Sequence, residues 1–359
     1  MIKIMHMADV HFGRAVSGLP ENLREIRRQE VRSTFSCAIN KANEDGVDVV
    51  LIAGDLFESS ETDKSTVTFI KGELEKISHI PVFVSPGNHD PLGNAYKMLK
   101  DSEIKNLTIF DKDTSKKDFP EKNLTVYGVG FSNEVTEQSL LKDIKAEDES
   151  RINIAVIHGE LAPNSPYNPI TEADIEKTGM DYIALGHVHT YSGIKKVGKT
   201  HWAYSGALEG GGFDECGDKG AIFGTVSKGK CDLNLVPLCK RKYVTVELDV
   251  SETVSVQEII EMVKDATVNK DNLYKIVLSG KRPEPINEEV INNEIDAFFS
   301  KVKDETRASY DLKAISSDYS IAGIFARNVL ERMENAAENE KNQLLKASDV
   351  VMDILNFKK

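Results

Sequence analysis

The sequence predicts an α/β protein built on mostly parallel sheets. Val- and Ile-rich apolar runs recur through the first half of the chain, and they are nearly continuous, as in strands buried on both faces. Helical patterns lie between them, the longest covering residues 21–44. Each run is also closed by a polar motif, as expected where ligands gather at the carboxyl ends of strands. The runs are residues 2–7, 47–53, 81–85, 152–157 and 181–185.

Later segments add antiparallel strands. Residues 111–123 form a charged stretch that predicts a loop before a strand at 124–130. Segments 193–206 and 221–236 are typical of hairpins, with turns near 198–199 and 227–229. These hairpins make the predicted sheet mixed.

A chain of 359 residues is longer than a single hydrophobic core usually accommodates, so we expect more than one domain. The basic run 239–242 marks the boundary between residues 1–240 and a second series of predicted strands and helices at 243–317. This series consists of a strand at 243–250, a helix at 255–267 that begins with a Ser255/Glu258 capping box, a strand at 274–279, a helix near 288–302 and a short strand near 310–315.

The last part, residues 319–359, predicts two helices with apolar stripes, separated by the polar stretch 338–343. Such stripes usually dock onto their own domain, but a terminal pair beyond a complete domain has little core left to join. We therefore favour partner binding. The stripes are Ile321, Ile324, Phe325, Val329 and Met333, then Leu344, Leu345, Val351, Ile354 and Leu355.

The net charge and the cysteine content argue against some classes of protein. A net charge of −13 argues against a protein that coats nucleic acid through a broadly basic surface. The four cysteines form no C-x-x-C pair, which favours reduced thiols and a cytoplasmic location. The first strand begins at Ile2 and leads to Asp9, so we expect no signal peptide, and no apolar stretch has membrane-spanning length.

Seven potential metal ligands follow the five apolar runs. A single D-x-H or H-G motif is weak evidence, but five such motifs in order make coincidence a poor explanation. His6, His79 and His201 lack this support and are expected to be packing or surface residues. The seven are Asp9, His11, Asp55, Asn88, His158, His187 and His189.

The ligand set indicates two divalent cations. Carboxylate, imidazole and amide groups together suit Mn, Fe or Zn, whereas a structural zinc site closes with four ligands. Asp55 follows Gly54, which permits a tight turn, so we assign Asp55 to bridge two ions roughly 3.5–4 Å apart.

These motifs (D-V-H, G-D-L-F-E, G-N-H-D, H-G and G-H-V-H) resemble those of the calcineurin-like metallophosphoesterases. Together with the blocks at 204–206, 208–210, 213–215 and 219–220, they resemble the SbcD and YhaO type of DNA repair exonuclease. The resemblance implies a four-layer α/β/β/α sandwich for the nuclease domain, residues 1–240, and a small α/β capping domain at 243–317. Two departures are Glu58, where Asp is common, and Ser205, where Pro-Gly is usual.

The resemblance also implies roles for individual residues. One metal is surrounded by Asp9, His11, Asp55 and His189, and the other by Asp55, Asn88, His158 and His187. Two Mn²⁺ ions are expected, and a hydroxide bridging them would attack phosphorus. His89 would act on the leaving group, with Asp90 placed to orient or charge its ring, and Arg14 is a candidate for contacting phosphate.

The expected function is that of a two-metal-dependent phosphodiesterase, a DNA repair exonuclease or endonuclease. Its expected partners are DNA and an SbcC-like coiled-coil ATPase gripping the C-terminal helices; homodimer formation is left open, and no membrane is involved. The alternatives are an enzyme on small phosphodiesters or phosphomonoesters and a non-catalytic scaffold on DNA ends. The scaffold is disfavoured because no ligand is missing.

One helix face carries a possible DNA contact. Arg24, Arg27, Arg28 and Arg32 share a face of the predicted helix 21–44, opposite Leu23, Ile26, Phe35, Ile39 and Ala42. The alternative is a solvated face paired with Glu21, Glu25 and Glu30, and the pattern slightly favours it.

Overall fold

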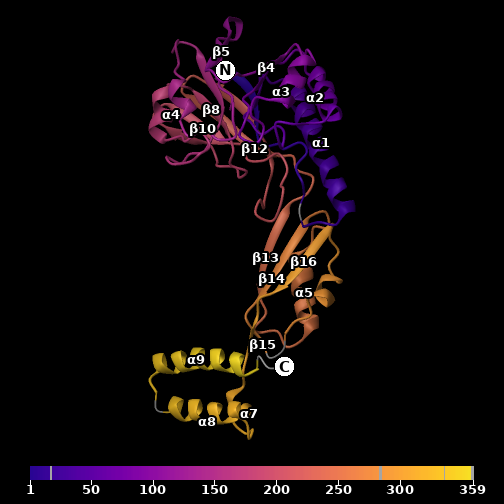
Figure 1. Cartoon of the computed structure of the whole chain (residues 1–359), viewed down its shortest axis with the longest axis vertical. Helices are drawn as coiled ribbons and strands as arrows, with labels where there is room; N and C mark the ends of the chain where they lie inside the picture. The colour runs from indigo at the N-terminus through magenta and orange to yellow at the C-terminus, as the bar shows by residue number, and fades with distance from the viewer. Residues whose placement is uncertain (17, 283–284, 335, 357–359) are drawn as a thin grey trace. The chain divides into compact units, whose positions relative to one another are not determined.

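The computed structural model describes residues 1–16, 18–282, 285–334 and 336–356. It divides into two compact units, Met1–Tyr243 and Val244–Lys359, which are described separately (Figure 1). No described helix is both long enough and apolar enough to cross a membrane.

The first unit begins with a six-stranded sheet in the order β12-β11-β1-β2-β3-β4. Strands β1 (Ile2–Met7), β2 (Val49–Ile52), β3 (Val82–Val84) and β4 (Leu107–Ile109) are parallel, and β11 (Gly220–Ser227) and β12 (Lys230–Pro237) form the predicted hairpin. Met7 pairs with Ile52, and Ile52 with Val84. The residues that follow β1, β2 and β3 therefore emerge side by side.

The second sheet has the order β5-β6-β7-β8-β10-β9. Strands β6 (Leu124–Gly128), β7 (Ile152–His158), β8 (Tyr182–Gly186) and β10 (Thr200–Tyr204) are parallel, with β5 (Ser115–Phe119) and β9 (Lys195–Val197) antiparallel at the edges. His158 pairs with Gly186, so β7 and β8 also end together.

Helices cover the outer faces of both sheets (Figure 1). Helices α1 (Glu21–Glu44), α2 (Lys64–Lys76) and α3 (Asn94–Asp101) lie on the first sheet, and α4 (Glu172–Thr178) with the 3-10 turn η2 (Leu140–Asp143) lies on the second. A third apolar cluster joins the sheets, with Ile4 and Leu51 from the first and Ile154 from the second. The predicted four-layer α/β/β/α sandwich is confirmed.

The predicted loop 111–123 is wrong in part, because it contains β5 and the 3-10 turn η1 (Pro120–Lys122). Strand β5 pairs with β6 alone and carries exposed Lys116 and Lys117. Charged side chains are common on edge strands because they discourage pairing between molecules. They also remove the apolar alternation by which a strand is recognised.

The second unit holds a three-stranded sheet in the order β13-β14-β16, from β13 (Tyr243–Asp249), β14 (Leu273–Ser279) and β16 (Phe299–Asp304). Helix α5 (Val256–Ala266) begins as predicted, with the Ser255 side chain accepting from the Glu258 backbone, while the Glu258 carboxylate accepts from the Val254 backbone. The short strands β15 (Lys281–Arg282) and β17 (Arg307–Ala308) pair with each other. The assignment of residues 243–317 as a cap stays a prediction.

Two predicted elements of this unit are wrong. The helix expected at 288–302 ends early, as α6 (Glu288–Asn292), and residues 299–304 form β16 instead. Pairing with β14, in which Val302 faces Ile276, outweighs local propensity. The strand expected at 310–315 is helix α7 (Leu312–Ile315), because the Asp311 side chain accepts from the backbone of Lys313 and Ala314.

The chain ends in α8 (Ile321–Glu334) and α9 (Glu338–Asn356), as predicted, although the polar stretch 338–343 is the start of α9 rather than a spacer. Val329 and Met352 are buried in a small cluster shared by the two helices and α7. Other members of the stripes stay exposed, among them Ile321 (73%), Ile324 (55%) and Ile354 (67%). Part of each apolar stripe is therefore left uncovered within the described residues.

Candidate metal centre

The seven predicted ligands come from the carboxyl ends of five parallel strands. Asp9 and His11 follow β1, Asp55 follows β2, and Asn88 follows β3. His158 is the last residue of β7, and His187 and His189 follow β8. The structure brings all seven side chains into one cluster, as the contacts below describe.

Three side chains meet on one side of the cluster. The Asn88 Oδ1 atom lies 2.9 Å from His158 Nε2 and 3.0 Å from His187 Nδ1. An amide oxygen between two imidazole nitrogens is an arrangement in which all three can face one cation.

A second group lies beside the first. The Nε2 atoms of His11 and His189 are 3.1 Å apart, and Asp9 Oδ1 is 3.9 Å from His189 Nε2. Asp55 Oδ2 lies 3.8 Å from His11 Nε2 and 3.4 Å from His158 Nε2, one histidine of each group. Asp55 thus has the position expected of a bridging residue.

Several of these residues have a strained backbone. Asp9, His11, Asp55 and His187 have φ values of 52°, 50°, 48° and 106°, in a region that residues other than glycine seldom adopt. Hydrogen bonds hold these turns: the Asp9 backbone N–H donates to Gly54, and that of His11 donates to Asp55. Such strain clusters at functional sites, where the surrounding structure enforces it.

Two glycines permit the close approach of these loops. A Cβ on Gly54, where φ is +89°, would lie 2.4 Å from His158 Nδ1. A Cβ on Gly87 would lie 2.2 Å from Asp55 Oδ1. Any larger residue at either position would displace a predicted ligand.

The histidine rings are oriented by oxygen atoms outside the cluster. His158 Nδ1 lies 2.9 Å from the Ala53 carbonyl, His189 Nδ1 lies 2.8 Å from Glu215 Oε1, and His11 Nδ1 lies 2.9 Å from Glu58 Oε2. For His158 and His189 the acceptor at Nδ1 holds the proton there and leaves the Nε2 lone pair directed inward, as is usual for metal-binding histidines, while for His11 the Glu58 carboxylate lies beside Nδ1. The two Nε2 atoms 3.1 Å apart, on His11 and His189, suit a shared cation.

The electrostatic environment of the cluster also favours the binding of positive ions. The Asp9 and Asp55 side chains are almost fully buried, and burial raises the pKa of Asp9. Burial lowers the pKa of His158 to about 4, so that its imidazole is neutral and can offer a lone pair. Buried carboxylates beside a neutral imidazole need compensating charge, which divalent cations supply. The residues present therefore fit a pair of metal ions.

Sequence reasoning missed the residues that support the ligands. Glu215 contacts His189 and also forms an ion pair of 2.7 Å with Arg14, and Lys219 donates to the His189 carbonyl. Glu58 contacts His11. The blocks 213–215 and 219–220 contributed to the family resemblance, but their spacing carried no information about which side chain they would meet.

His89 lies at the rim of the cluster. Its side chain is 45% exposed, its ring centroid is 4.9 Å from that of His11, and its backbone N–H donates to Asp55. The ring is therefore close to the ligands and open to solvent.

The predicted role of Asp90 in orienting His89 is wrong. The Asp90 carboxylate is buried and accepts hydrogen bonds from Gly87 N, Phe57 N and the Tyr96 hydroxyl. It thereby holds the turn that carries Asn88. The carboxylate nearest to the His89 ring is Glu58, with Oε1 4.0 Å from Nδ1.

The arginines that were predicted to share one face of α1 lie in different environments. Arg24 and Arg28 pair with Glu21 and Glu25, as the solvated-face interpretation predicts. Arg27 instead is 1% exposed. It pairs with two buried carboxylates, those of Glu30 and Glu209.

The apolar face predicted for α1 also needs correction. Phe35, Ile39 and Ala42 are buried, but Ile26 is 41% exposed. The first half of the helix therefore buries a charged cluster around Arg27, because the loop after β10 presents Glu209 to it.

The fold and this set of converging ligands define a metal-dependent phosphoesterase. Residues 2–191 match the family model of the calcineurin-like phosphoesterases, and the chain belongs to this family. Members use divalent metal ions to hydrolyse phosphate esters.

Curated relatives are similar to this chain over more residues than the family model covers. The chain is 26% identical over 300 residues to the uncharacterized metallophosphoesterase YhaO of Bacillus subtilis, covering 79% of this chain and 73% of that protein. It is 24% identical over 384 residues to the DNA double-strand break repair protein Mre11 of Saccharolobus solfataricus, covering 99% and 98%. The Mre11 protein of Sulfurisphaera tokodaii is 27% identical over 385 residues, covering 99% and 92%.

Proposed function

We propose that the chain is a two-metal-dependent nuclease that hydrolyses phosphodiester bonds in DNA, acting in repair as an exonuclease or endonuclease. The observation that carries this proposal is the convergence of seven ligand side chains beside the exposed His89. The similarity to two proteins named for DNA double-strand break repair supports the choice of DNA, because it extends over both units of the chain.

The metal ligands divide into two sets in this proposal. Asp9, His11 and His189 hold one ion, Asn88, His158 and His187 hold the other, and Asp55 contacts both. We assign Mn²⁺, which suits mixed oxygen and nitrogen ligands. When bound, the two ions lower the pKa of the attacking water and neutralise charge on the phosphate.

Three further residues act on the substrate or on its surroundings. His89 holds and delivers a proton at the leaving oxygen, a role that suits an imidazole open to solvent. Glu58, which lies near both His89 and His11, keeps these two rings in place. Arg14, 29% exposed and anchored by Glu215, contacts a phosphate that flanks the scissile one.

The C-terminal helices provide the partner site in this proposal. Ile321 and Ile324 on α8 and Val350 and Ile354 on α9 are more than half exposed, although the two helices bury other apolar residues against each other. Such residues on paired helices suit an apolar groove or helix of a second protein. We propose an SbcC-like coiled-coil ATPase as that protein, and a cytoplasmic location, since the four cysteines form no disulfide in the part of the chain that the structure describes.

The test is a hydrolysis assay with Mn²⁺ that compares linear duplex DNA, single-stranded DNA and a chromogenic phosphodiester. We expect the protein to cleave DNA. Chelation of the metal should abolish this cleavage, and Mn²⁺ should restore it. Hydrolysis of the chromogenic diester without cleavage of either DNA would favour the small-substrate alternative. No hydrolysis in any arm, with both metals bound, would favour the non-catalytic scaffold.

A further inference from the structure

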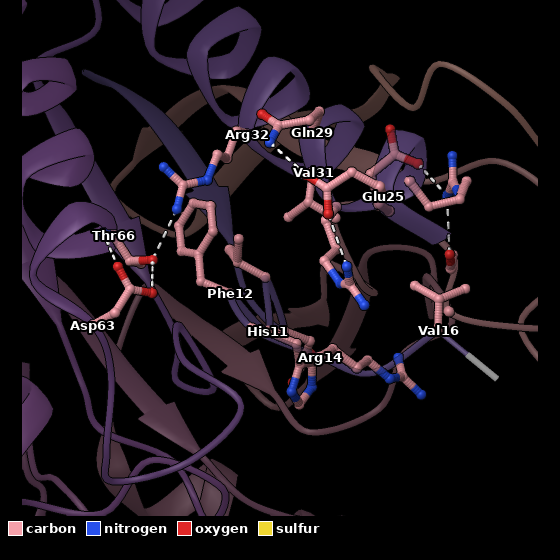
Figure 2. A pocket seen from close by; sticks show the side chains of 18 residues that line it. His11, Phe12, Arg14, Val16, Glu25, Gln29, Val31, Arg32, Asp63 and Thr66 are labelled. Carbon is pink, nitrogen blue, oxygen red and sulfur yellow. Dashed lines mark hydrogen bonds and ion pairs between the residues drawn. The ribbon is translucent and has the colours of Figure 1, made fainter. Parts of the chain in front are cut away.

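A pocket adjoins the metal centre, between α1 and the segment that follows β1. Its volume is about 190 Å³, and Asp9 and His11 contribute to its wall. Figure 2 shows Gln29, Val31 and Arg32 of α1 on one side of the space and Phe12 and Val16 on the other. A molecule in this pocket would contact the same two side chains that the metal centre uses.

Apolar side chains form part of the pocket wall. Val10, Phe12, Val16 and Val31 line it, and the Phe12 ring packs edge-on against Phe35 with centroids 5.2 Å apart. An apolar cavity of ~150 Å³ in another protein holds one benzene ring. The pocket is thus large enough for a single flat ring system and far too small for a base pair with its backbone.

Guanidinium groups also line the pocket, among them those of Arg14, Arg28 and Arg32. Arg32 donates to the Thr66 hydroxyl and lies 5.1 Å over the Phe69 ring, so its position is fixed by contacts on two sides. Cations beside an apolar slot can bind the phosphate of a nucleotide whose base occupies the slot.

The acidic side chains of the pocket are already engaged, apart from Asp9, which belongs to the metal centre. Glu25 accepts from Arg28, Glu209 accepts from the buried Arg27, and Asp63 caps α2. Their negative charge is therefore offset locally and opposes a phosphate less than free carboxylates would.

We propose that this pocket binds one unpaired nucleobase of the strand whose phosphodiester lies at the metal centre. The inference rests on the proposed function and specifies its substrate class: single-stranded DNA, or a duplex end whose terminal pair has opened. The base enters between Phe12 and Val31, and Arg14 or Arg32 binds the adjoining phosphate.

The first test compares ligands on the metal-loaded, full-length protein. Calorimetry measures the affinity for deoxyadenosine 5′-monophosphate and for 2-deoxyribose 5-phosphate, which differ by the base alone. The base is expected to strengthen binding at least about tenfold, the scale of base stacking in single-strand binding proteins. Equal affinities would overturn the proposal, and this comparison needs no variant.

The second test locates the base in the pocket. Val31→Phe places a ring in the space and is expected to make the two affinities equal. Cys37→Phe is the matched control, since Cys37 is exposed on the same helix and does not line the pocket, and it should keep the wild-type ratio. A ratio unchanged in Val31→Phe, with an unaltered melting temperature, would show that the base binds elsewhere.

A third measurement separates this inference from the proposed function. Single-stranded oligonucleotides with one abasic residue, moved position by position past the cleavage point, are expected to lose about tenfold in kcat/KM at one position. If cleavage is the same for every abasic position, the base-binding pocket is contradicted and the nuclease proposal stands. If calorimetry shows a base preference but no DNA is cleaved, the nuclease proposal is contradicted and the pocket remains a nucleotide-binding site.

Discussion

The Nε2 atoms of His11 and His189 lie 3.1 Å apart although 178 residues separate the two histidines in the chain. A carboxylate lies outside each ring: Glu58 lies 2.9 Å from His11 Nδ1, and Glu215 is hydrogen-bonded to His189 Nδ1. The contact therefore depends on two sheets, two loops and two acidic residues, all of which must be in place before a cation can bind.

Replacing Asp55 should affect both metal positions. In Asp55→Asn one carboxylate oxygen becomes an amide, which cannot offset the charge of two cations, and Mn²⁺ affinity should fall by more than about 100-fold. Metal analysis of the purified protein measures the occupancy. Asp113→Asn, a change in an exposed loop, is the control. Full occupancy by two ions with normal turnover in Asp55→Asn would remove Asp55 from the bridging role.

Glu215 should tune the metal centre without binding an ion. Burial opposes its charge, yet the contacts with His189 and Arg14 lower the pKa of Glu215, so the carboxylate is ionised at neutral pH. Glu215→Gln should weaken Mn²⁺ binding about 10–100-fold, as expected for a partner of a metal-binding histidine. Mn²⁺ titrations monitored by calorimetry measure this, with the exposed neighbour in Asp214→Asn as control. An unchanged affinity would assign Glu215 to folding alone.

His89 should matter for chemistry and not for metal content. His89→Ala keeps every predicted ligand, so both ions should remain, while kcat should fall about 10²–10⁴-fold because the leaving oxygen lacks a proton donor. His79→Ala, at an exposed histidine, should behave as the wild type. Near-normal kcat in His89→Ala would contradict the assigned role.

The ligand cluster could be predicted because it depends on topology more than on detail. Each ligand follows a parallel strand, and the register of β1, β2 and β3 places their ends together. Any arrangement of these strands into parallel sheets would direct the same loops to one edge. The order of the motifs was therefore enough to predict that these side chains would cluster.

Residues that support the cluster could not be predicted in the same way. Asp90 lies next to His89 in sequence, but its buried carboxylate meets Tyr96 and two backbone amides. Arg27 shares a helix face with solvated arginines and yet is buried against Glu209, 182 residues away. A helical or strand period gives the direction of a side chain, whereas its partner is set by the packing of distant segments. The strand β16 was missed for the same reason.

The buried Arg27 should be a major contributor to stability. Arg27→Met leaves the Glu209 carboxylate buried without its cation and should reduce the free energy of unfolding by about 3–5 kcal/mol. Arg28→Ala on the same helix, where the side chain is 41% exposed, should cost less than about 1 kcal/mol. Urea denaturation measures both. Adding Glu209→Gln to Arg27→Met should recover part of the loss, and a similar cost for the two single variants would contradict this account.

Asp63 should make the stability of the first unit depend on pH. It caps α2, and hydrogen bonds from the Ser65 hydroxyl and the Thr66 backbone lower the pKa of Asp63 to about 2. In the unfolded chain an Asp has a pKa of about 3.9. Because the folded value is the lower one, the charged cap stabilises the protein above about pH 4, and this contribution is lost as the pH falls from about 4 to about 2.

Urea denaturation of the metal-free protein tests this dependence. Asp63→Ala should lower the free energy of unfolding by about 1 kcal/mol at pH 7, the usual cost of losing an N-cap, and its difference from the wild type should shrink between about pH 4 and pH 2. Asp63→Asn keeps a capping oxygen without the charge, so it should lose less than the alanine variant and show a smaller change with pH. A difference between wild type and Asp63→Ala that stays constant down to pH 2 would mean that the cap acts without its charge.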